Sequence, residues 1–250
     1  MTPADHEIAW SLAAAAGELL LQVRQRDFPD AAARKAAGDA EAHRFLVDRL
    51  AALCPDDAVL SEEGADDPVR LTAGRVWIVD PLDGTREFSE LDRADWAVHV
   101  ALWERGELAA GAVALPAEGA TLGSGDVPAA PSRADGPMRL AVSRSRPPAL
   151  VADVAAQLGA ELVPMGSAGV KAMSVVRGTT DAYVHGGGQY EWDSAAPVAI
   201  ARAAGLHASR LDGSPLRYNQ PDPYLPDLLV CRPELAARLL DTLAGVVPGR

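Results

Sequence analysis

Helical spacing of hydrophobic positions dominates the first fifth of the chain. Residues 7–24 place apolar side chains every three or four positions, and residues 39–53 repeat that spacing. Such a stripe covers one face of an amphipathic helix. A short apolar run at 58–60 follows and ends in Ser61-Glu62-Glu63. The pattern therefore predicts two helices and then a short strand that is followed directly by acids.

The middle of the chain changes to the pattern of strands. The segment "WAVHVALWERGELAAGAVALP" contains two apolar runs on either side of a polar turn with Gly106. This arrangement is typical of a β-hairpin or a meander. Residues 123–136 are rich in Gly, Pro, Ser and Asp, so they are the best candidate for a domain boundary or a mobile loop.

Beyond residue 136, apolar runs alternate with helical patterns. We predict strands at 138–142, 162–165, 181–185 and 227–232, and helices at 148–158, 167–177, 192–205 and 233–243. Meander strands first and strand–helix alternation later favour layers of sheets and helices. We expect two closely joined halves, residues 1–136 and 137–250.

One motif, "RVWIVDPLDGTREFS" at residues 75–89, demands a chemical explanation. It begins as a buried strand and then places Asp80 and Asp83 around a proline. Carboxylates that follow an apolar run are poorly solvated, and they repel each other. Pro81 stiffens the turn, which can project both carboxylates and the Leu82 carbonyl to one side.

A divalent cation would explain this arrangement. Hard ions such as Mg²⁺ prefer carboxylate, carbonyl and water oxygens, and the ion removes the repulsion between the acids. If the next segment is helical, the free N–H groups of Gly84 and Thr85 form a site for an anion. Taken alone, Asp-Gly is also an ordinary turn sequence, so the motif needs support from elsewhere in the chain.

Composition narrows the possible ligands. The chain has 250 residues, is 48% hydrophobic and carries a net charge of −12. We expect no binding of nucleic acid polymers through a broad basic surface, although a small phosphorylated ligand remains possible. Cys54 and Cys231 are the only cysteines, which favours a reducing cytoplasm. No signal peptide and no membrane-spanning run is recognisable.

Three spaced blocks give the motif its context. "WIVDPLDGT" resembles the central signature of the inositol monophosphatase superfamily, the lithium-sensitive, magnesium-dependent phosphatases. "SEE" before it and "WDSAAPVAIARAAG" after it resemble the other two blocks of that family, in the same order. The resemblance covers nearly the whole chain. It implies a layered α/β fold, an α-β-α-β-α sandwich with metals at the junction of its halves, and commonly a homodimer.

The resemblance also implies roles for individual residues. The implied ligands of two or three Mg²⁺ ions are Glu62, Asp80, the Leu82 carbonyl, Asp83 and Asp193, of which all but Asp193 lie in the first half. Asp39 matches the acid that pairs with the motif threonine, here Thr85, and this pair would orient and deprotonate the attacking water. Asp39 and Asp193 could each instead be a helix N-cap.

The sequence says less directly which phosphate ester is the substrate. Members of the family act on inositol phosphates, fructose 1,6-bisphosphate or 3′-phosphoadenosine 5′-phosphate. In "DAYVHGGGQYEWD", His185 lies near the place where inositol phosphatases usually carry a glutamate. The segment "RLDGSPLRYNQPDPYLPDLLVCR" resembles the nucleotidase branch, the CysQ proteins, and most closely their actinobacterial members.

This resemblance implies a set of substrate contacts, namely Gly84, Thr85, Gly166, Ser167, Lys171, His185, Tyr190, Arg217 and Tyr218. Arg210 is a further candidate for a second phosphate, because a fork of donors suits that group. The alternatives are a partly buried strand histidine at 185 and ordinary surface arginines at 210 and 217.

The leading hypothesis is therefore a Mg²⁺-dependent 3′(2′),5′-bisphosphate nucleotidase that releases AMP and phosphate from adenosine bisphosphate. An inositol-1-phosphate or fructose-1,6-bisphosphate phosphatase is the alternative enzyme. An inactive nucleotide-binding module is a third possibility, but the intact set of acids argues against it. We expect no membrane partner and a homodimer.

Overall fold

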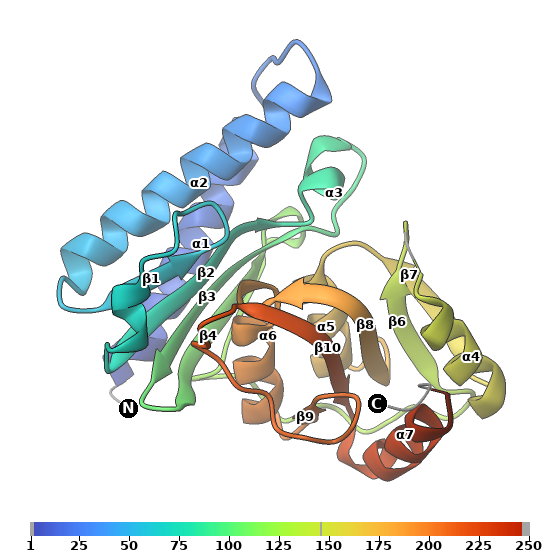
Figure 1. The fold of residues 1–250 in the computed structure, drawn as a ribbon. Coiled ribbons are helices and arrows are strands. Elements are labelled where there is room, and N and C mark those ends of the chain that lie inside the picture. Colours follow the sequence, from blue (N-terminus) through green and yellow to red (C-terminus); the bar gives the residue numbers. More distant parts are fainter. Residues whose placement is uncertain (1–2, 146, 247–250) are drawn as a thin grey trace.

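Two five-stranded sheets and three helical layers make up the fold, which a computed structural model describes for residues 3–145 and 147–246. The layers follow one another as helices, sheet, helices, sheet, helices (Figure 1). The α-β-α-β-α sandwich expected from the sequence is thereby confirmed.

The first sheet has the strand order β1-β2-β3-β4-β5. Its strands are β1 (Ala58–Ser61), β2 (Arg75–Asp83), β3 (Ala97–Glu104), β4 (Glu107–Leu115) and β5 (Ala120–Gly123). β1 and β2 are parallel, and the other pairs are antiparallel. Two long helices, α1 (Pro3–Arg24) and α2 (Ala31–Leu53), cover one face of this sheet (Figure 1).

The second sheet has the order β7-β6-β8-β10-β9. Its strands are β6 (Arg139–Ser143), β7 (Glu161–Met165), β8 (Ala182–Tyr190), β9 (His207–Ser209) and β10 (Tyr224–Cys231). β6 runs parallel to β7 and β8, whereas β10 is antiparallel to β8 and β9. The outer face is covered by α4 (Ala149–Leu158) and α7 (Pro233–Val246).

The middle layer consists of α5 (Ala168–Val176) and α6 (Glu191–Ala203), which lie between the two sheets (Figure 1). One continuous apolar cluster combines side chains of β2 and β4 with side chains of α5, α6 and β10. The halves are therefore joined by a shared core. The predicted boundary at 136/137 lies in the connection between β5 and β6, and the division into two domains stays a prediction.

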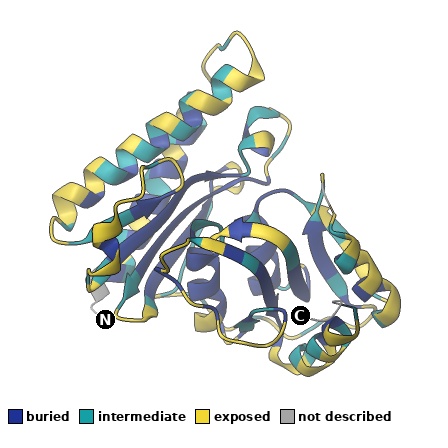
Figure 2. Ribbon diagram, in the orientation of Figure 1, coloured by how far each residue is buried: buried dark blue, intermediate teal, exposed yellow. Residues whose placement is uncertain are grey.

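Short elements complete the fold. They are α3 (Thr85–Ser89) and two 3₁₀ helices, Pro68–Leu71 and Pro116–Glu118. The central strands and the inner helix faces are buried, while β7, the second half of β8 and the outward faces of α2, α4 and α7 are more exposed (Figure 2). Across the described part of the chain, every helix is too short or too polar to cross a membrane.

Two boundaries differ from the sequence prediction for identifiable reasons. α2 begins at Ala31, eight residues earlier than predicted, because the Asp30 carboxylate accepts a hydrogen bond from the Ala33 N–H and caps the helix. Asp39 is thus inside α2, and its interpretation as an N-cap is wrong. β8 continues to Tyr190 through three glycines that carry no apolar signal, so its second half was not predicted.

Candidate active site

A β-bulge brings Asp80 and Asp83 to the same face of the first sheet. Side chains three residues apart in a regular strand point to opposite faces. Here Asp80 is paired with His99 and Asp83 with Ala97, so β2 has one extra residue at this point. Such an insertion re-aims the following side chain. Both aspartates are buried, and ligand atoms of Asp80, Asp83 and His99 lie within 4.8 Å of one another.

Four carboxylates form what we call the acid cluster: Glu62, Asp80, Asp83 and Asp193. Burial, followed by the charges of Glu62 and Asp83, raises the pKa of Asp80 well above its usual value. Burial and then the charge of Asp83 raise the pKa of Asp193 to about 7. Because these shifts require close approach, the structure brings together acids from both halves of the chain.

Glu62 lies at the exposed side of the acid cluster. It follows β1, its backbone N–H donates to the Val79 carbonyl, and its carboxyl shares a hydrogen bond with Asp80. Burial of the carboxyl raises the pKa of Glu62 although the residue reaches the surface. Within the described residues, no arginine or lysine forms an ion pair with Glu62, Asp80 or Asp193. A hard cation with oxygen ligands fits this donor set.

Asp83 differs from its neighbours because the protein surrounds one of its oxygens with donors. Its Oδ2 accepts hydrogen bonds from Ser167 Oγ at 2.5 Å and from the Gly169 N–H at 2.7 Å. Burial opposes the charged form, yet His99, Lys171 and Ser167 together lower the pKa of Asp83. The chain itself therefore stabilises this carboxylate.

His99 is a site residue that the sequence reasoning missed. It is fully buried, with Nδ1 3.0 Å from the Trp192 carbonyl and Nε2 3.2 Å from Asp83 Oδ2. Burial works against protonation, but the Asp83 carboxylate prevails and raises the pKa of His99. The available signal was a single polar residue in the apolar run "WAVHVALW", since a buried polar side chain requires a partner.

The segment after Asp83 is helical, with Gly84 as the N-cap and Thr85 as the first helical residue. Gly84 has φ 85° and precedes α3, and a Cβ there would lie 3.2 Å from the Asp95 carbonyl and from Ser167 Cβ. Only glycine combines that backbone conformation with so close an approach. Thr85 is the first residue of α3, so its N–H and that of Gly84 belong to the unsatisfied donors of a helix start.

Asp39 lies in α2, away from any helix end. Burial, and then the neighbouring charge of Glu63, raise the pKa of the Asp39 carboxyl to about 6. No hydrogen bond links it to Thr85 among the described residues, so that pairing stays a prediction. Gly38 brings α2 close to the motif, because a Cβ at that position would lie 2.8 Å from the Phe88 ring and 2.9 Å from Leu82.

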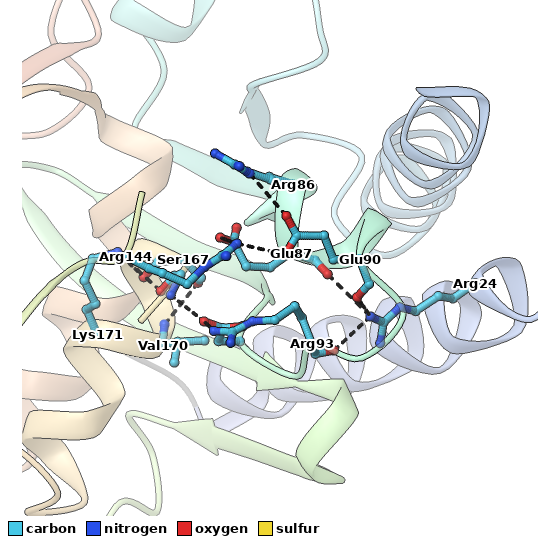
Figure 3. Close-up of polar contacts among 11 residues, drawn as sticks. Arg24, Arg86, Glu87, Glu90, Arg93, Arg144, Ser167, Val170 and Lys171 are labelled. Atoms are coloured by element: carbon cyan, nitrogen blue, oxygen red, sulfur yellow. Dashed lines mark hydrogen bonds and ion pairs between the residues drawn. The ribbon is translucent and has the colours of Figure 1, made fainter. Parts of the chain in front are cut away.

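A second group of acids next to α3 is paired with arginines; we call it the α3 network. It consists of Glu87 and Glu90 with Arg144, of Asp95 with Arg93, and of Arg24, which donates to backbone carbonyls nearby. Figure 3 shows Arg24, Glu87, Glu90, Arg93 and Arg144 close together. Arg144 Nη2 donates to Glu87 Oε1 at 2.8 Å and to Glu90 Oε2 at 2.9 Å.

The rest of the α3 network ties the segment that follows α3 to α1 and to the residue Gly166 that precedes α5. Asp95 pairs with Arg93 and also accepts a hydrogen bond from the Gly166 N–H. Arg24 donates to the carbonyls of Glu90 and Arg93. Burial opposes the charge of Asp95, but Arg93 and the Gly166 N–H lower its pKa.

The predicted substrate contacts at 166, 167 and 171 cluster at the start of α5. Ser167 caps the helix with φ 50°, a left-handed conformation that is strained for a residue other than glycine. Lys171 is buried, its Nζ donates to the carbonyls of Gly166 and Ser167, and it lies 5.3 Å from the centre of the Tyr183 ring. Burial lowers the pKa of Lys171.

His185 borders a small cavity on β8. The cavity has a volume of about 320 Å³ and is lined by Ser143, Pro148, Tyr183, His185 and glycines 186–188, among others. His185 Nδ1 lies 3.4 Å from the Tyr183 hydroxyl, and burial lowers the pKa of the imidazole. The histidine is thus half-buried beside open space, which leaves both of its interpretations tenable.

Tyr190 belongs to an exposed aromatic cluster directly before Asp193. Its ring stacks on Trp192 at a centroid distance of 4.8 Å and meets Tyr224 edge-on at 5.8 Å. Tyr190 and Tyr224 are each more than 40% exposed. The Tyr190 N–H donates to Asp193 Oδ2, so Asp193 supports the first turn of α6 without being its N-cap.

The remaining candidates differ in accessibility. Tyr218 is buried and its hydroxyl lies 3.2 Å from Ser194 Oγ, which argues against the predicted contact with a nucleotide. Arg210 pairs with both oxygens of Asp227, so its fork of donors is occupied. Arg217 is exposed and lines a second cavity of about 360 Å³ that also contains Tyr224.

Comparison with known proteins agrees with this fold. Residues 5–246 match the model of the inositol monophosphatase family. The chain therefore belongs to the inositol monophosphatase family.

Individual relatives narrow the position within that family. The chain is 53% identical to a 3′-phosphoadenosine 5′-phosphate phosphatase of Mycobacterium leprae, over 97% of this chain and 94% of the relative. It is 32% identical to the 3′(2′),5′-bisphosphate nucleotidase CysQ of Escherichia coli, over 86% and 94% of the two chains. Among solved structures, CysQ from Bacteroides thetaiotaomicron superposes with a TM-score of 0.79 at 28% identity, covering 92% and 97% of the two chains.

Proposed function

We propose that this protein is a Mg²⁺-dependent 3′(2′),5′-bisphosphate nucleotidase that hydrolyses 3′-phosphoadenosine 5′-phosphate to AMP and phosphate. The observation that carries the proposal is the acid cluster, in which buried carboxylates from both halves meet without an arginine or lysine partner among the described residues. The printed activities of the mycobacterial and Escherichia coli relatives support the choice of substrate.

The acid cluster has the donor set that Mg²⁺ requires. Glu62, Asp80, the Leu82 carbonyl, Asp83 and Asp193 would hold two or three ions, as the family resemblance implies. When bound, Mg²⁺ supplies positive charge that lowers the pKa of water and stabilises the attacking and leaving oxygens of an in-line displacement.

Other groups of the chain would bind and orient the reactants. The N–H groups of Gly84 and Thr85 at the start of α3 would hold phosphoryl oxygens. Asp39 and Thr85 would orient the attacking water. A carboxyl whose pKa is raised to about 6, as in Asp39, is well matched to accept a proton near neutral pH.

Selection of a nucleotide would depend on residues outside the acid cluster. The ring of Tyr190 is exposed and next in space to Trp192 and Tyr224, and aromatic rings of this kind stack on bases. Lys171, Ser167 and Gly166 near Asp83, His185 beside its cavity, and the exposed Arg217 complete the proposed set of substrate contacts. The homodimer and the cytoplasmic location predicted from the sequence belong to the same proposal.

A substrate panel tests the proposal. Adenosine 3′,5′-bisphosphate, inositol 1-phosphate and fructose 1,6-bisphosphate are compared at equal concentration, with Mg²⁺ and with a chelator. We expect the nucleotide to be preferred by at least about tenfold in kcat/KM, since one charge-assisted hydrogen bond contributes about 1.5–3 kcal/mol. AMP should accumulate. If inositol 1-phosphate is hydrolysed as fast or faster, the nucleotide is not the preferred substrate and that assignment is wrong. If no ester releases phosphate in a Mg²⁺-dependent way, the assignment as a phosphatase is wrong.

A single variant examines the aromatic contact. Tyr190→Ala should raise KM for adenosine 3′,5′-bisphosphate by about fivefold or more, because stacking on a base contributes about 1–3 kcal/mol. Hydrolysis of any ester without a base should be unaffected, and Tyr190→Phe serves as the matched control. An unchanged KM for the nucleotide in Tyr190→Ala would exclude the stacking role.

A further inference from the structure

His99 connects the two halves of the protein directly beneath the acid cluster. It comes from β3 in the first sheet and is opposite Asp80 on β2. One ring nitrogen reaches Asp83 of the first half, and the other reaches the Trp192 carbonyl of α6. A side chain with no exposed surface and a polar atom at each end has room for few arrangements.

On the Asp83 side, His99 is the third contact to one oxygen. Ser167 Oγ, the Gly169 N–H and His99 Nε2 all approach Oδ2, and the described residues place no hydrogen bond on Oδ1. Two hydrogen bonds and the 3.2 Å approach of His99 Nε2, which lacks hydrogen-bond geometry, together restrict the rotation of the carboxylate. The other oxygen is then presented in a constant direction, which is how outer partners control the affinity of a metal ligand.

On the α6 side, His99 supports a weakened first turn. Pro197 lies inside α6 and has no N–H, so the carbonyl of Asp193 lacks its helical partner four residues later. The hydrogen bond from His99 Nδ1 to the Trp192 carbonyl attaches this turn to β3. Asp193 is the next residue, so its position depends on the same attachment.

The His99 ring packs directly against the backbone of α5 at Gly169. A Cβ on Gly169 would lie 2.1 Å from His99 Nε2, well inside van der Waals contact. Alanine favours a helix over glycine by about 1 kcal/mol, and Gly169 lies in α5. The close approach to His99 explains glycine here.

We propose that His99 is a positioning residue of the metal site, which holds Asp83 and the Asp193 turn of α6 at a fixed separation. The inference rests on the Mg²⁺ site of the proposed function. It adds that the relative placement of ligands from the two halves is set by this one side chain.

Three substitutions separate the two contacts of His99. Asparagine places its amide nitrogen near the position of Nδ1, glutamine places its own near Nε2, and leucine offers neither. His99→Asn therefore keeps the bond to the Trp192 carbonyl, His99→Gln keeps the contact with Asp83, and His99→Leu keeps only the volume.

The readout is the binding of Mn²⁺ to metal-stripped protein, measured by calorimetry or electron paramagnetic resonance. We expect His99→Leu to bind Mn²⁺ about 10–100-fold more weakly than the unaltered protein, the usual effect of losing an outer partner. His99→Asn and His99→Gln should each recover part of that loss. Equal affinity in all four proteins, or an equal loss in all three variants, would overturn the proposal, since ring volume alone would then account for His99.

Gly169→Ala provides a second route if His99→Leu does not fold. The added Cβ must displace His99, so Mn²⁺ affinity should fall by a similar factor even though the helix gains propensity. In the His99→Asn protein, whose side chain is shorter, Gly169→Ala should cost at most a few-fold more. Full affinity in the single Gly169→Ala variant would overturn the proposal.

Thr180→Val is the matched control. It removes a buried hydrogen bond between Thr180 Oγ1 and Ser174 Oγ, away from the acid cluster. Its thermal stability should fall while Mn²⁺ affinity stays unchanged. If His99→Leu also loses only stability, His99 has no role at the metal site. If the unaltered protein binds no Mn²⁺, the proposed function fails before the role of His99 is tested.

Discussion

The acid cluster and the α3 network are adjacent in the chain, since β2 ends at Asp83 and α3 begins at Thr85. Both bury carboxylates. In the α3 network, Arg93 lowers the pKa of Asp95 against the effect of burial. In the acid cluster, burial and neighbouring charges raise the pKa of Asp80 and bring that of Asp193 to about 7.

The difference shows where the chain supplies its own counter-charge. Arg24 attaches the segment around α3 to α1, and Arg144 attaches it to the end of β6, so the acids there stabilise the structure. Of the acid cluster, only Asp83 has a lowered pKa, because His99, Lys171 and Ser167 together outweigh the effect of burial. The remaining acids are costly to keep charged unless a cation from solution joins them.

The largest effect that this comparison predicts comes from Asp80→Asn. Turnover should fall by more than about a hundredfold, because losing even an outer partner of a metal ligand costs about 10–100-fold. The metal-free protein should be as thermally stable as the unaltered protein or more so, because an amide removes the repulsion with Glu62. Asp241→Asn, at an exposed position of α7, is the control. Near-normal Mg²⁺-dependent turnover in Asp80→Asn would show that the acid cluster is not the metal site, and the contrast with the α3 network would then be wrong.

The next effect concerns pH. The pKa of Asp193 is raised to about 7 in the folded protein, so its protonated form stabilises the fold. That contribution is complete below the unfolded pKa of about 4 and is lost as pH rises through 7. The Tm of metal-free protein should therefore fall by several degrees between pH 5 and pH 8, as expected for a loss on the order of a few kcal/mol.

Mg²⁺ provides the control for the pH measurement. Saturating Mg²⁺ should remove most of the decrease in Tm, because the ion replaces the proton as the counter-charge of the acid cluster. Asp193→Asn should weaken the pH dependence even without the ion. A metal-free Tm that is constant or rises from pH 5 to pH 8 would show that ionisation of the acid cluster does not destabilise the fold.

The smallest effect is expected in the α3 network. Arg144→Ala leaves the buried Glu87 carboxylate without its cation, which should lower the stability of the fold. The Tm should fall by several degrees in metal-free and Mg²⁺-loaded protein alike. The increase in Tm caused by Mg²⁺ should not change. A selective loss of that increase would mean that the α3 network is part of the metal site, and the two regions would no longer be distinct.

Local patterns were sufficient to predict most of the fold. The spacing of apolar residues identified α1, because an amphipathic stripe is recorded in the sequence itself. In "WDSAAPVAIARAAG", Gly205 marked the end of the helix that is α6. The beginning of α2 was placed too late, since its first turns contain no apolar residue larger than alanine and depend on the Asp30 cap. The last residues of β8 are glycines and polar residues, whose strand conformation comes from pairing with β10.

In the site, too, local sequence motifs were predictable and features that depend on tertiary packing were not. The motif predicted that Asp80 and Asp83 lie together, although the sequence does not show the bulge that turns both to one face. His99 was missed because its partners, Asp83 and Trp192, meet it only after the two sheets pack on α6. Tyr218 was predicted to face a ligand, but its burial depends on the packing of α6.

Titration of metal-stripped protein with Mg²⁺ tests the central claim most directly. Calorimetry at pH 8 would follow binding, and thermal unfolding would follow stability. The account predicts saturable binding of two or more ions per chain, a Tm that rises with Mg²⁺, and the loss of both effects in Asp80→Asn but not in Arg144→Ala. Absence of saturable binding, or identical binding by Asp80→Asn, would contradict the claim that the acid cluster depends on an external cation.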